Sequence, residues 1–71
     1  MNAKNRAEIE NIENDLIEQM KALIRIRAEL IVADDLLPVE NLAIEDAIQG
    51  VVKAIANLGK GKISAAEKEV A

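Results

Sequence analysis

The chemistry available to this sequence starts from Ser64, which carries the only side-chain hydroxyl among the 71 residues. A serine nucleophile needs a general base, and the absence of histidine excludes a Ser-His-acid arrangement. Lysine is the remaining base, supplied by Lys60, Lys62 or Lys68. The run from Ser64 to Glu67 instead has the spacing of a capping box, in which two side chains hydrogen-bond to the first turn of a helix. We therefore predict that Ser64 caps a short helix and is not catalytic.

Carboxylates are the second group of side chains that could do chemistry, as metal ligands or as acid–base catalysts. The most clustered are Glu8, Glu10, Glu13, Asp15, Glu18, Asp34, Asp35, Glu45 and Asp46. Carboxylate-bridged metal sites in helical bundles normally add histidines at helical spacing, and the chain has none. Asp34-Asp35 also lacks the alternating ligands and the central glycine of an EF-hand loop. We expect these side chains to be solvated or to cap helices, and we expect no metal, no cofactor and no enzyme activity.

The segment Gly59-Lys60-Gly61-Lys62 combines exposed backbone amides with positive charge, and both can bind phosphate. A P-loop requires the pattern G-x-x-x-x-G-K-[ST] between a strand and a helix, and this segment lacks that spacing. Glycine also commonly ends a helix, because it adopts left-handed backbone angles at little cost. The sequence therefore predicts that a helix ends at Gly59 and that a flexible joint follows it.

The overall composition argues against several classes of protein before any helix is placed. Nine basic and thirteen acidic residues give a formal net charge of −4, whereas general nucleic-acid binders usually have a basic excess. The longest apolar run is far shorter than the roughly 20 residues that cross a bilayer, and no apolar leader is visible. Cysteine and all aromatic residues are absent, so neither disulfides nor ring stacking is available. We expect a cytoplasmic protein that does not contact a membrane.

Helical period is the strongest pattern in the chain, and it runs from about Asn5 to Ala33. Large apolar residues recur at intervals of three and four, as in an amphipathic helix, at Ile9, Ile12, Leu16, Met20, Leu23, Ile24, Leu30 and Ile31. One heptad register pairs Ile9, Leu16, Leu23, Leu30 and Leu37 with Ile12, Gln19, Ile26 and Ala33. A second row, parallel to the first, contains Ile17, Ile24 and Ile31. So wide an apolar face favours a helical bundle over a two-stranded coiled coil.

Pro38 interrupts this pattern, because proline disfavours helical geometry in the preceding residue and is well suited to the first position of a helix. We predict a turn over residues 34–38 and a second helix over Val39–Leu58. Its apolar stripe is Ile44, Ile48, Val51, Ile55 and Leu58, and Glu45, Asp46, Gln49, Lys53 and Asn57 face away. Residues 1–71 then form a single small all-α domain, an antiparallel hairpin of a long and a shorter helix. Residues 59–71 are expected to be a flexible tail or a short C-terminal helix.

Arg27 is the exception on the apolar face of the first predicted helix, where it lies on the same line as Ile9. A charge in that position must be paired or must extend to water. Asp34 and Glu13 lie close to the same line along the helix. One hypothesis is that Arg27 pairs with an acid of another helix and that the pair sets the register or the oligomeric state; the alternative is that Arg27 lies one position off this line or that a bend exposes it.

The predicted hairpin leaves apolar surface uncovered, because a helix of about 30 residues meets a partner of only about 20. Two hairpins would bury this surface in a dimeric four-helix bundle, and a higher or domain-exchanged oligomer is the alternative. We expect the oligomer interface at Ile9, Ile12, Leu16, Met20, Leu23, Ile24, Arg27, Leu30, Ile31, Ile44, Ile48, Val51, Ile55 and Leu58.

Contact is the function that remains for a chain with so few catalytic residue types. We predict a non-enzymatic protein–protein interaction module, a small homo-oligomeric helical adaptor, regulator or inhibitor, comparable in size with short phage and plasmid regulators. Besides a second copy, we expect another protein as a partner, and Ile26, Val32, Leu36, Leu37, Val39 and Leu42 are candidates either for its contact surface or for closing the end of the bundle. The alternative is a helical-hairpin dimer that binds nucleic acid or a nucleotide through Arg25, Arg27, Lys53, Lys60 and Lys62.

Overall fold

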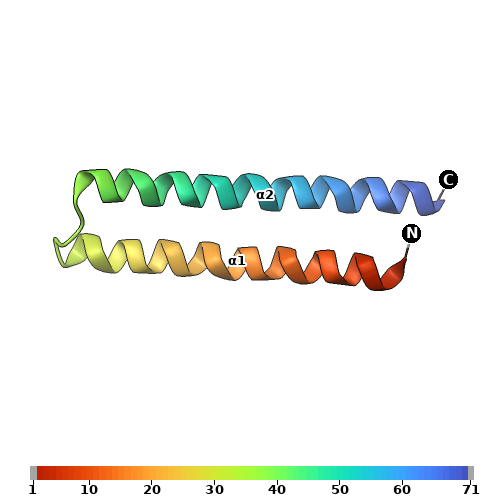
Figure 1. The fold of residues 1–71 in the computed structure, drawn as a ribbon, viewed down its shortest axis with the longest axis horizontal. Helices are drawn as coiled ribbons and strands as arrows, with labels where there is room; N and C mark the ends of the chain where they lie inside the picture. The colour runs from red at the N-terminus through yellow and green to blue at the C-terminus, as the bar shows by residue number, and fades with distance from the viewer. Residues whose placement is uncertain (1, 71) are drawn as a thin grey trace.

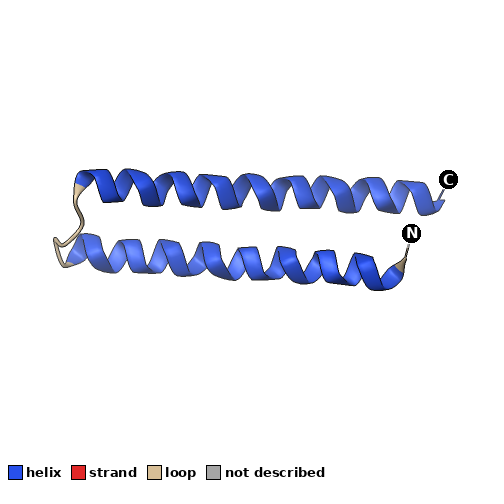
Figure 2. Cartoon of the chain, in the orientation of Figure 1, coloured by secondary structure: helices blue, strands red, loops and turns tan. Residues whose placement is uncertain are grey.

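Two antiparallel helices make up the part of the chain that this computed structural model describes, residues 2–70. Helix α1 spans Ala3–Val32, helix α2 spans Pro38–Val70, and a loop of residues 33–37 joins them. The hairpin is a rod of 54 × 16 × 13 Å, in which the helices lie side by side (Figure 1). No strand occurs within residues 2–70 (Figure 2). The prediction of an all-α antiparallel hairpin is therefore confirmed.

Both ends of α1 are closed by hydrogen bonds from flanking residues. At its start, Oδ1 of Asn2 accepts the backbone N–H two residues further on at 2.8 Å, and so satisfies one of the donors that a helix N-terminus leaves free. At its end, Asp34 adopts a left-handed backbone with φ of 57°. The N–H groups of Asp34 and Asp35 then donate to the carbonyls of Ile31 and Leu30, each at 3.1 Å. This pair of bonds is a Schellman motif, with aspartate at the position where glycine is commonest.

Helix α2 begins at Pro38, where the missing N–H of proline costs nothing because the first helical donors have no partner in the helix. The backbone N–H of Leu37 donates to Oε1 of Glu40 at 3.0 Å, which is one half of a capping box. The carboxylate of Glu40 also lies in the first turn, where the helix dipole favours negative charge. The predicted turn before α2 is confirmed, and so is the prediction that the second helix starts at or just after Pro38.

The predicted end of the second helix is wrong, because α2 continues through Gly59, Gly61 and Ser64 to Val70. Neither glycine has a positive φ, so neither caps the helix, and no flexible joint or separate short helix follows. Ser64 lies inside α2 and not at a helix start, so the capping role predicted for it is also wrong. The amides of residues 59–62 belong to the helix and are not free to bind phosphate.

Packing against α1 explains why the glycines do not end α2. Each glycine in a helix interior costs about 1 kcal/mol relative to alanine, which is enough to end an isolated helix. Leu58, which precedes the glycines, is half-buried, and Ala65, which follows them, is the most buried residue described. The apolar contact of these two side chains with α1 offsets the cost of the glycines between them.

The two helices are of nearly equal length, 30 and 33 residues, because α2 reaches Val70. The expectation that the N-terminal third of α1 has no partner within the chain is therefore wrong, since the last turns of α2 lie beside it (Figure 1). The unequal helix lengths that predicted association are absent. Any need for a partner must come from the sides of the rod instead.

Burial within the hairpin is shallow. Ala65, at 4% exposure, is the one buried residue among residues 2–68, for which side-chain burial is described. Ten large aliphatic side chains in the same range are 45–87% exposed: Ile12, Ile24, Ile26, Ile31, Val32, Leu37, Val39, Leu42, Val52 and Ile63. Each of two helices can cover only one stripe of the other, so much of the wide apolar face of α1 lies outside their contact.

Candidate interaction surface

The contact between the two helices, called the seam here, uses two rows of α1 with a spacing of seven residues. The aliphatic row is Ile9, Leu16, Leu23 and Leu30, the mixed row is Arg6, Glu13, Met20 and Arg27, and all eight side chains are half-buried. The sequence pattern instead paired the aliphatic row with Ile12, Gln19 and Ile26. That pairing is wrong for the hairpin, because those three side chains are exposed. The mixed row can lie in the seam because its long side chains bury their stems and reach polar partners at their tips.

Helix α2 contributes two corresponding rows to the seam. They are Ile44, Val51, Leu58 and Ala65, and Asn41, Ile48, Ile55 and Lys62, of which only Lys62 is exposed. Along the rod, the middle of the seam is therefore aliphatic and both of its ends are polar. These polar ends hold the cross-helix hydrogen bonds and ion pairs described next.

The loop-end network consists of Arg27, Asn41 and Glu45. Nη2 of Arg27 donates to Oε1 of Glu45 at 2.8 Å, and its Nε donates to Oδ1 of Asn41 at 2.7 Å. Nδ2 of Asn41 donates to the same Glu45 oxygen at 3.3 Å, so the three side chains form a closed ring. The side chains of Arg27 and Glu45 are 32% and 40% exposed. The network thus satisfies a half-buried charge within one chain.

The structure gives Arg27 the acidic partner on another helix that the sequence analysis expected, but not the acids lying near it along its own helix. Its partner is Glu45, and neither Asp34 nor Glu13 bonds to it in the structure. The expectation that Glu45 faces away from the contact is wrong. Asn41 and Glu45 are one helical turn apart on α2, so both reach toward the same guanidinium.

The terminus-end pair joins Glu10 of α1 to Lys62 of α2, with Nζ 2.9 Å from Oε1. Both side chains are more than half exposed. A hydrogen bond from Lys62, and then its positive charge, hold the pKa of Glu10 below the ordinary value of 4.5. The hydrogen bond to Glu10, then the charges of Glu10 and Glu13, raise the pKa of Lys62 above 10.5.

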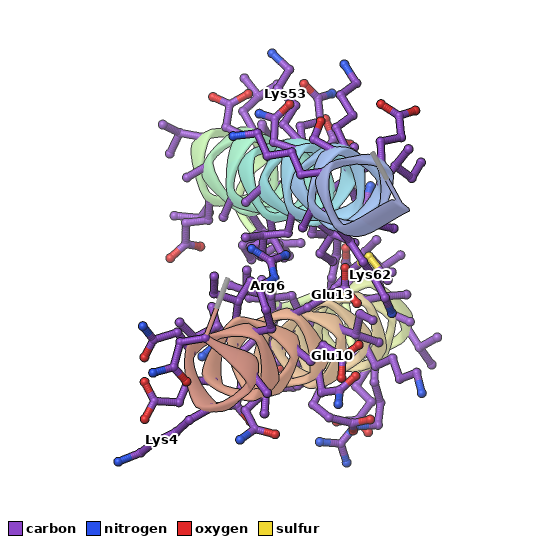
Figure 3. All side chains as sticks on the ribbon, turned by 90° about the vertical axis from the view of Figure 1, so that its right-hand side faces the viewer. Lys4, Arg6, Glu10, Glu13, Lys53 and Lys62 are labelled. Carbon is purple, nitrogen blue, oxygen red and sulfur yellow. The ribbon has the colours of Figure 1, made fainter. Side chains whose placement is uncertain are left out.

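An open groove lies beside the terminus-end pair, with a volume of about 190 Å3. Figure 3 looks along the rod from this end and shows Glu10, Glu13 and Lys62 gathered at the seam, whereas Lys4 and Lys53 point away from it. The groove is lined by Arg6, Ile9, Glu10, Glu13, Leu58, Lys62, Ala65 and Ala66. It therefore has an apolar floor and charges of both signs at its rim.

The sequence indicates both ion pairs through the distance of each residue from the turn, which the helical pattern alone does not show. Residues 27 and 45, and likewise residues 10 and 62, lie at equal chain distances on either side of Leu36, at the loop. In an antiparallel hairpin, residues equally far from the turn face each other. Locating the turn and then pairing residues across it would have identified Glu45 and Lys62 as partners.

Two flanks border the seam, one on each side. The ion-paired flank is Glu10, Ile17, Ile24 and Ile31 of α1 with Glu45, Val52, Gly59 and Ala66 of α2. The uncharged flank is the middle of the other pair of rows, Ile12, Gln19 and Ile26 of α1 with Ala47, Ala54 and Gly61 of α2; the same row of α2 carries Glu40 and Lys68 at its two ends. In an antiparallel pair of helices, a row that borders the seam on α1 lies next to the row with the equivalent heptad position on α2. The bonds of Glu10 to Lys62 and of Arg27 to Glu45 place both ion pairs on the first of these flanks.

The residues predicted for the oligomer interface divide between the seam and the flanks. Eleven are half-buried in the seam: Ile9, Leu16, Met20, Leu23, Arg27, Leu30, Ile44, Ile48, Val51, Ile55 and Leu58. Ile12, Ile24 and Ile31 are exposed on the flanks. Of the residues predicted as a second surface, Leu36 is half-buried, and Ile26, Val32, Leu37, Val39 and Leu42 are exposed.

The basic residues of the nucleic-acid alternative are not gathered into one patch. Arg27 and Lys62 form ion pairs within the hairpin, at opposite ends of the rod. Arg25, Lys53 and Lys60 are exposed. Lys53 points away from the seam on α2 (Figure 3), whereas Arg25 belongs to α1.

Neither helix, over the described residues 2–70, has an apolar stretch long enough to cross a membrane. Within the same part of the chain, no three acidic, histidine or cysteine side chains are grouped so that they could hold a metal ion. Comparison of the chain with protein families, curated proteins and solved structures found no match. The surface of the hairpin therefore has to be interpreted from its own geometry.

Proposed function

We propose that this chain is a non-enzymatic protein–protein interaction module, a small homo-oligomeric helical adaptor, regulator or inhibitor that acts through its aliphatic helix faces. The observation that carries the proposal is the contrast between burial and exposure. Only Ala65 is buried among residues 2–68, whereas ten large aliphatic side chains are at least 45% exposed. A chain with this distribution gains most of its available apolar burial only on association.

The stability of so small a hairpin supports the same proposal. A 71-residue chain buries a small share of its surface even when it is globular, and a rod of two helices buries less. Chains of this size usually add disulfides, a metal or oligomerisation, and this chain contains no cysteine or histidine. Association is the means that remains, and it would couple folding to the formation of the oligomer.

The contact chemistry also favours a protein partner over a nucleic acid. The exposed side chains that could bind are aliphatic, and the chain has no aromatic ring on which a base could stack. Two of the five candidate phosphate contacts, Arg27 and Lys62, already bond to carboxylates. Binding a phosphate would require these side chains to leave their partners.

Sedimentation equilibrium over a wide range of protein concentration, combined with circular dichroism at the same concentrations, tests the proposal. We expect mass and helical signal to rise together with concentration, because an isolated hairpin has little buried surface. A helical monomer with a constant unfolding temperature at every concentration would contradict the proposal.

A further inference from the structure

The two flanks of the hairpin are not equivalent places for a second copy to bind, although both carry exposed aliphatic side chains. On the ion-paired flank, Ile24 and Ile31 are each 49% exposed and Val52 is 45% exposed. On the uncharged flank, Ile12 is 52% exposed and Ile26 is 46% exposed. The ion-paired flank therefore exposes one more large aliphatic side chain than the uncharged flank, and a preference for the uncharged flank must come from the charges beside each flank.

A second hairpin that covers one flank also buries the seam row next to that flank. Beside the ion-paired flank lies the mixed row, so docking there would bring Arg6, Glu13 and Arg27 toward the centre of a four-helix bundle. Removing such charges from water is costly unless each is fully paired. Glu13 already lies half-buried in the seam, where its charge interacts with that of Lys62, and no side-chain hydrogen bond to Glu13 occurs among the described residues 2–68.

Beside the uncharged flank lies the aliphatic row, so docking there would bury Leu16 and Leu23 together with Ile12 and Ile26. The facing row of α2 is Ala47, Ala54 and Gly61, whose small side chains let a second helix approach closely. A Cβ atom added at Gly61 would meet nothing within 4 Å, as is also true of Gly59 on the other flank, so space does not separate the two flanks. Between Glu40 and Lys68, the uncharged flank can be covered without burying a charged side chain of its own rows.

The two ends of the rod carry different charge balances, which bear on the orientation of a second copy. Residues 27–45, around the loop, contain five acids and one base: Glu29, Asp34, Asp35, Glu40 and Glu45 against Arg27. Residues 2–10 and 62–70, at the other end, contain four bases and four acids: Lys4, Arg6, Lys62 and Lys68 against Glu8, Glu10, Glu67 and Glu69. Two loop ends placed together would repel each other, whereas a loop end beside a terminus end, whose charges balance, would not.

We propose that a second copy of this chain docks on the uncharged flank, with the two loops at opposite ends of a four-helix bundle. This inference rests on the homo-oligomer of the proposed function and specifies its interface. The aliphatic rows of both hairpins fill the centre of the bundle, and the mixed rows with their ion pairs lie at its outer edge. The acidic loop end of each hairpin then lies beside the charge-balanced terminus end of the other.

Two matched substitutions in α1 test the choice of flank. Ile26→Glu places a charge on the uncharged flank, and Ile24→Glu places the same charge on the ion-paired flank, at nearly equal exposure. We expect Ile26→Glu to raise the dimer dissociation constant by about tenfold or more, and Ile24→Glu to leave it nearly unchanged. The measurement is sedimentation equilibrium, with circular dichroism to confirm that both variants form helices at high concentration.

The outcomes of this pair separate the inference from the proposed function. A wild-type chain that is monomeric at all concentrations overturns the proposed function itself. A wild-type dimer that Ile24→Glu weakens as much as Ile26→Glu, or more, overturns only the assignment of the interface. If Ile26→Glu cannot form helices, Ala54→Glu on the facing row of α2 replaces it, and we expect the same rise.

Orientation is tested by the distance between loops in the dimer. The chain has no cysteine, so Asp35→Cys provides a single attachment point for a nitroxide at the loop end. Loops at opposite ends place the two labels roughly 45 Å apart, the length of a 30-residue helix, as measured by double electron–electron resonance. A distance of only about one or two helix diameters, roughly 10–20 Å, would overturn the opposite-end arrangement.

Discussion

The loop end and the terminus end of the seam each carry an ion pair that crosses between the helices, and the two pairs differ in their surroundings. Arg27 and Glu45 are 32% and 40% exposed and share their bonds with Asn41. Lys62 and Glu10 are 59% and 55% exposed, and among residues 2–68 no third side chain bonds to them. Their shortest N···O distances are almost the same, 2.8 and 2.9 Å. Distance alone therefore does not rank the two contacts.

This difference shows that the contribution of an ion pair to stability depends on its surroundings. Water screens the terminus-end pair, and ordering two long exposed side chains costs entropy, so its net contribution is small. At the loop end, removing one partner would leave a half-buried guanidinium without its carboxylate, which costs more than a lost surface contact. The loop end should therefore be the more firmly closed end of the hairpin.

The largest effect is expected from breaking the loop-end network with Glu45→Ala. This change removes the acceptor for both Arg27 and Asn41, and we expect the free energy of unfolding to fall by about 1–2 kcal/mol. Urea unfolding followed by circular dichroism at a fixed protein concentration measures it. Asp46→Ala, at the next and exposed position, is the control, and an equal loss in both variants would remove the special role of the network.

Near the terminus end, α2 contains Gly59 and Gly61, which lower the stability of this part of the helix. Gly59→Ala should therefore stabilise it. Gly59 has no positive φ, and an added Cβ meets nothing within 4 Å. We expect the free energy of unfolding to rise by about 0.5–1 kcal/mol, because alanine loses less backbone entropy in a helix. Gly50→Ala in the same helix should give a similar gain. A loss at Gly59 alone would show that the added methyl group has no room in the assembled protein.

The loop end in turn carries one strained residue, Asp34, whose φ is 57°. Asp34→Gly removes the Cβ that disfavours left-handed geometry and keeps the Schellman hydrogen bonds. We expect a gain of about 0.5 kcal/mol in the free energy of unfolding, less than the full strain, because glycine also makes the unfolded chain more flexible. Asp35→Gly, at a position without positive φ, should not stabilise the protein, and thermal unfolding compares the two.

The smallest effect is expected at the terminus-end pair, where Glu10→Gln should weaken the hairpin only slightly and mainly through its pH dependence. The lowered pKa of Glu10 means that its contribution is present above pH 4.5 and is lost as pH falls through the pKa of the folded protein. The raised pKa of Lys62 means that its contribution is present below pH 10.5 and is lost above it. Glu10→Gln should therefore equal wild type at low pH and lie below it near neutrality.

Thermal unfolding of both proteins across this pH range, at low and high salt, checks the prediction. Added salt should reduce the difference at neutral pH, because both side chains are exposed. A difference that persists at pH 2, or one as large as that of Glu45→Ala, would contradict the weak role given to this pair.

The sequence predicts the features of the fold that depend on local preference. The period of residues 5–33 and the position of Pro38 determine α1, the turn and the start of α2, because these signals need no information about distant contacts. The end of α2 depends on packing between Ala65 and α1, so the glycines gave the wrong prediction. Local propensity is a weak guide where tertiary contacts offset it.

The interaction surface was predictable in its composition but not in its arrangement. The sequence analysis assigned to an oligomer interface eleven residues that the structure places in the seam of a single hairpin, and it paired the aliphatic row of α1 with Ile12 and Ile26. The actual neighbour is the mixed row with Arg27, because Glu45 and Asn41 of α2 hold that charge in the seam. Which row of α1 lies in the seam depends on the register between the two helices. The residue pattern of α1 alone does not determine that register.

The hairpin geometry also sets an order in which the molecule can assemble. Arg27 lies 14 positions from Asn41 and 18 positions from Glu45 in the chain. Glu10 and Lys62 are much farther apart, because each lies toward a different end of the chain. Closing a short loop costs less entropy than closing a long one, so native contacts form most easily beside the loop and then extend toward the termini. We therefore expect the two helices to pair progressively from the loop toward the termini. We also expect local opening to begin at the terminus end and pairing to begin again at the acidic turn.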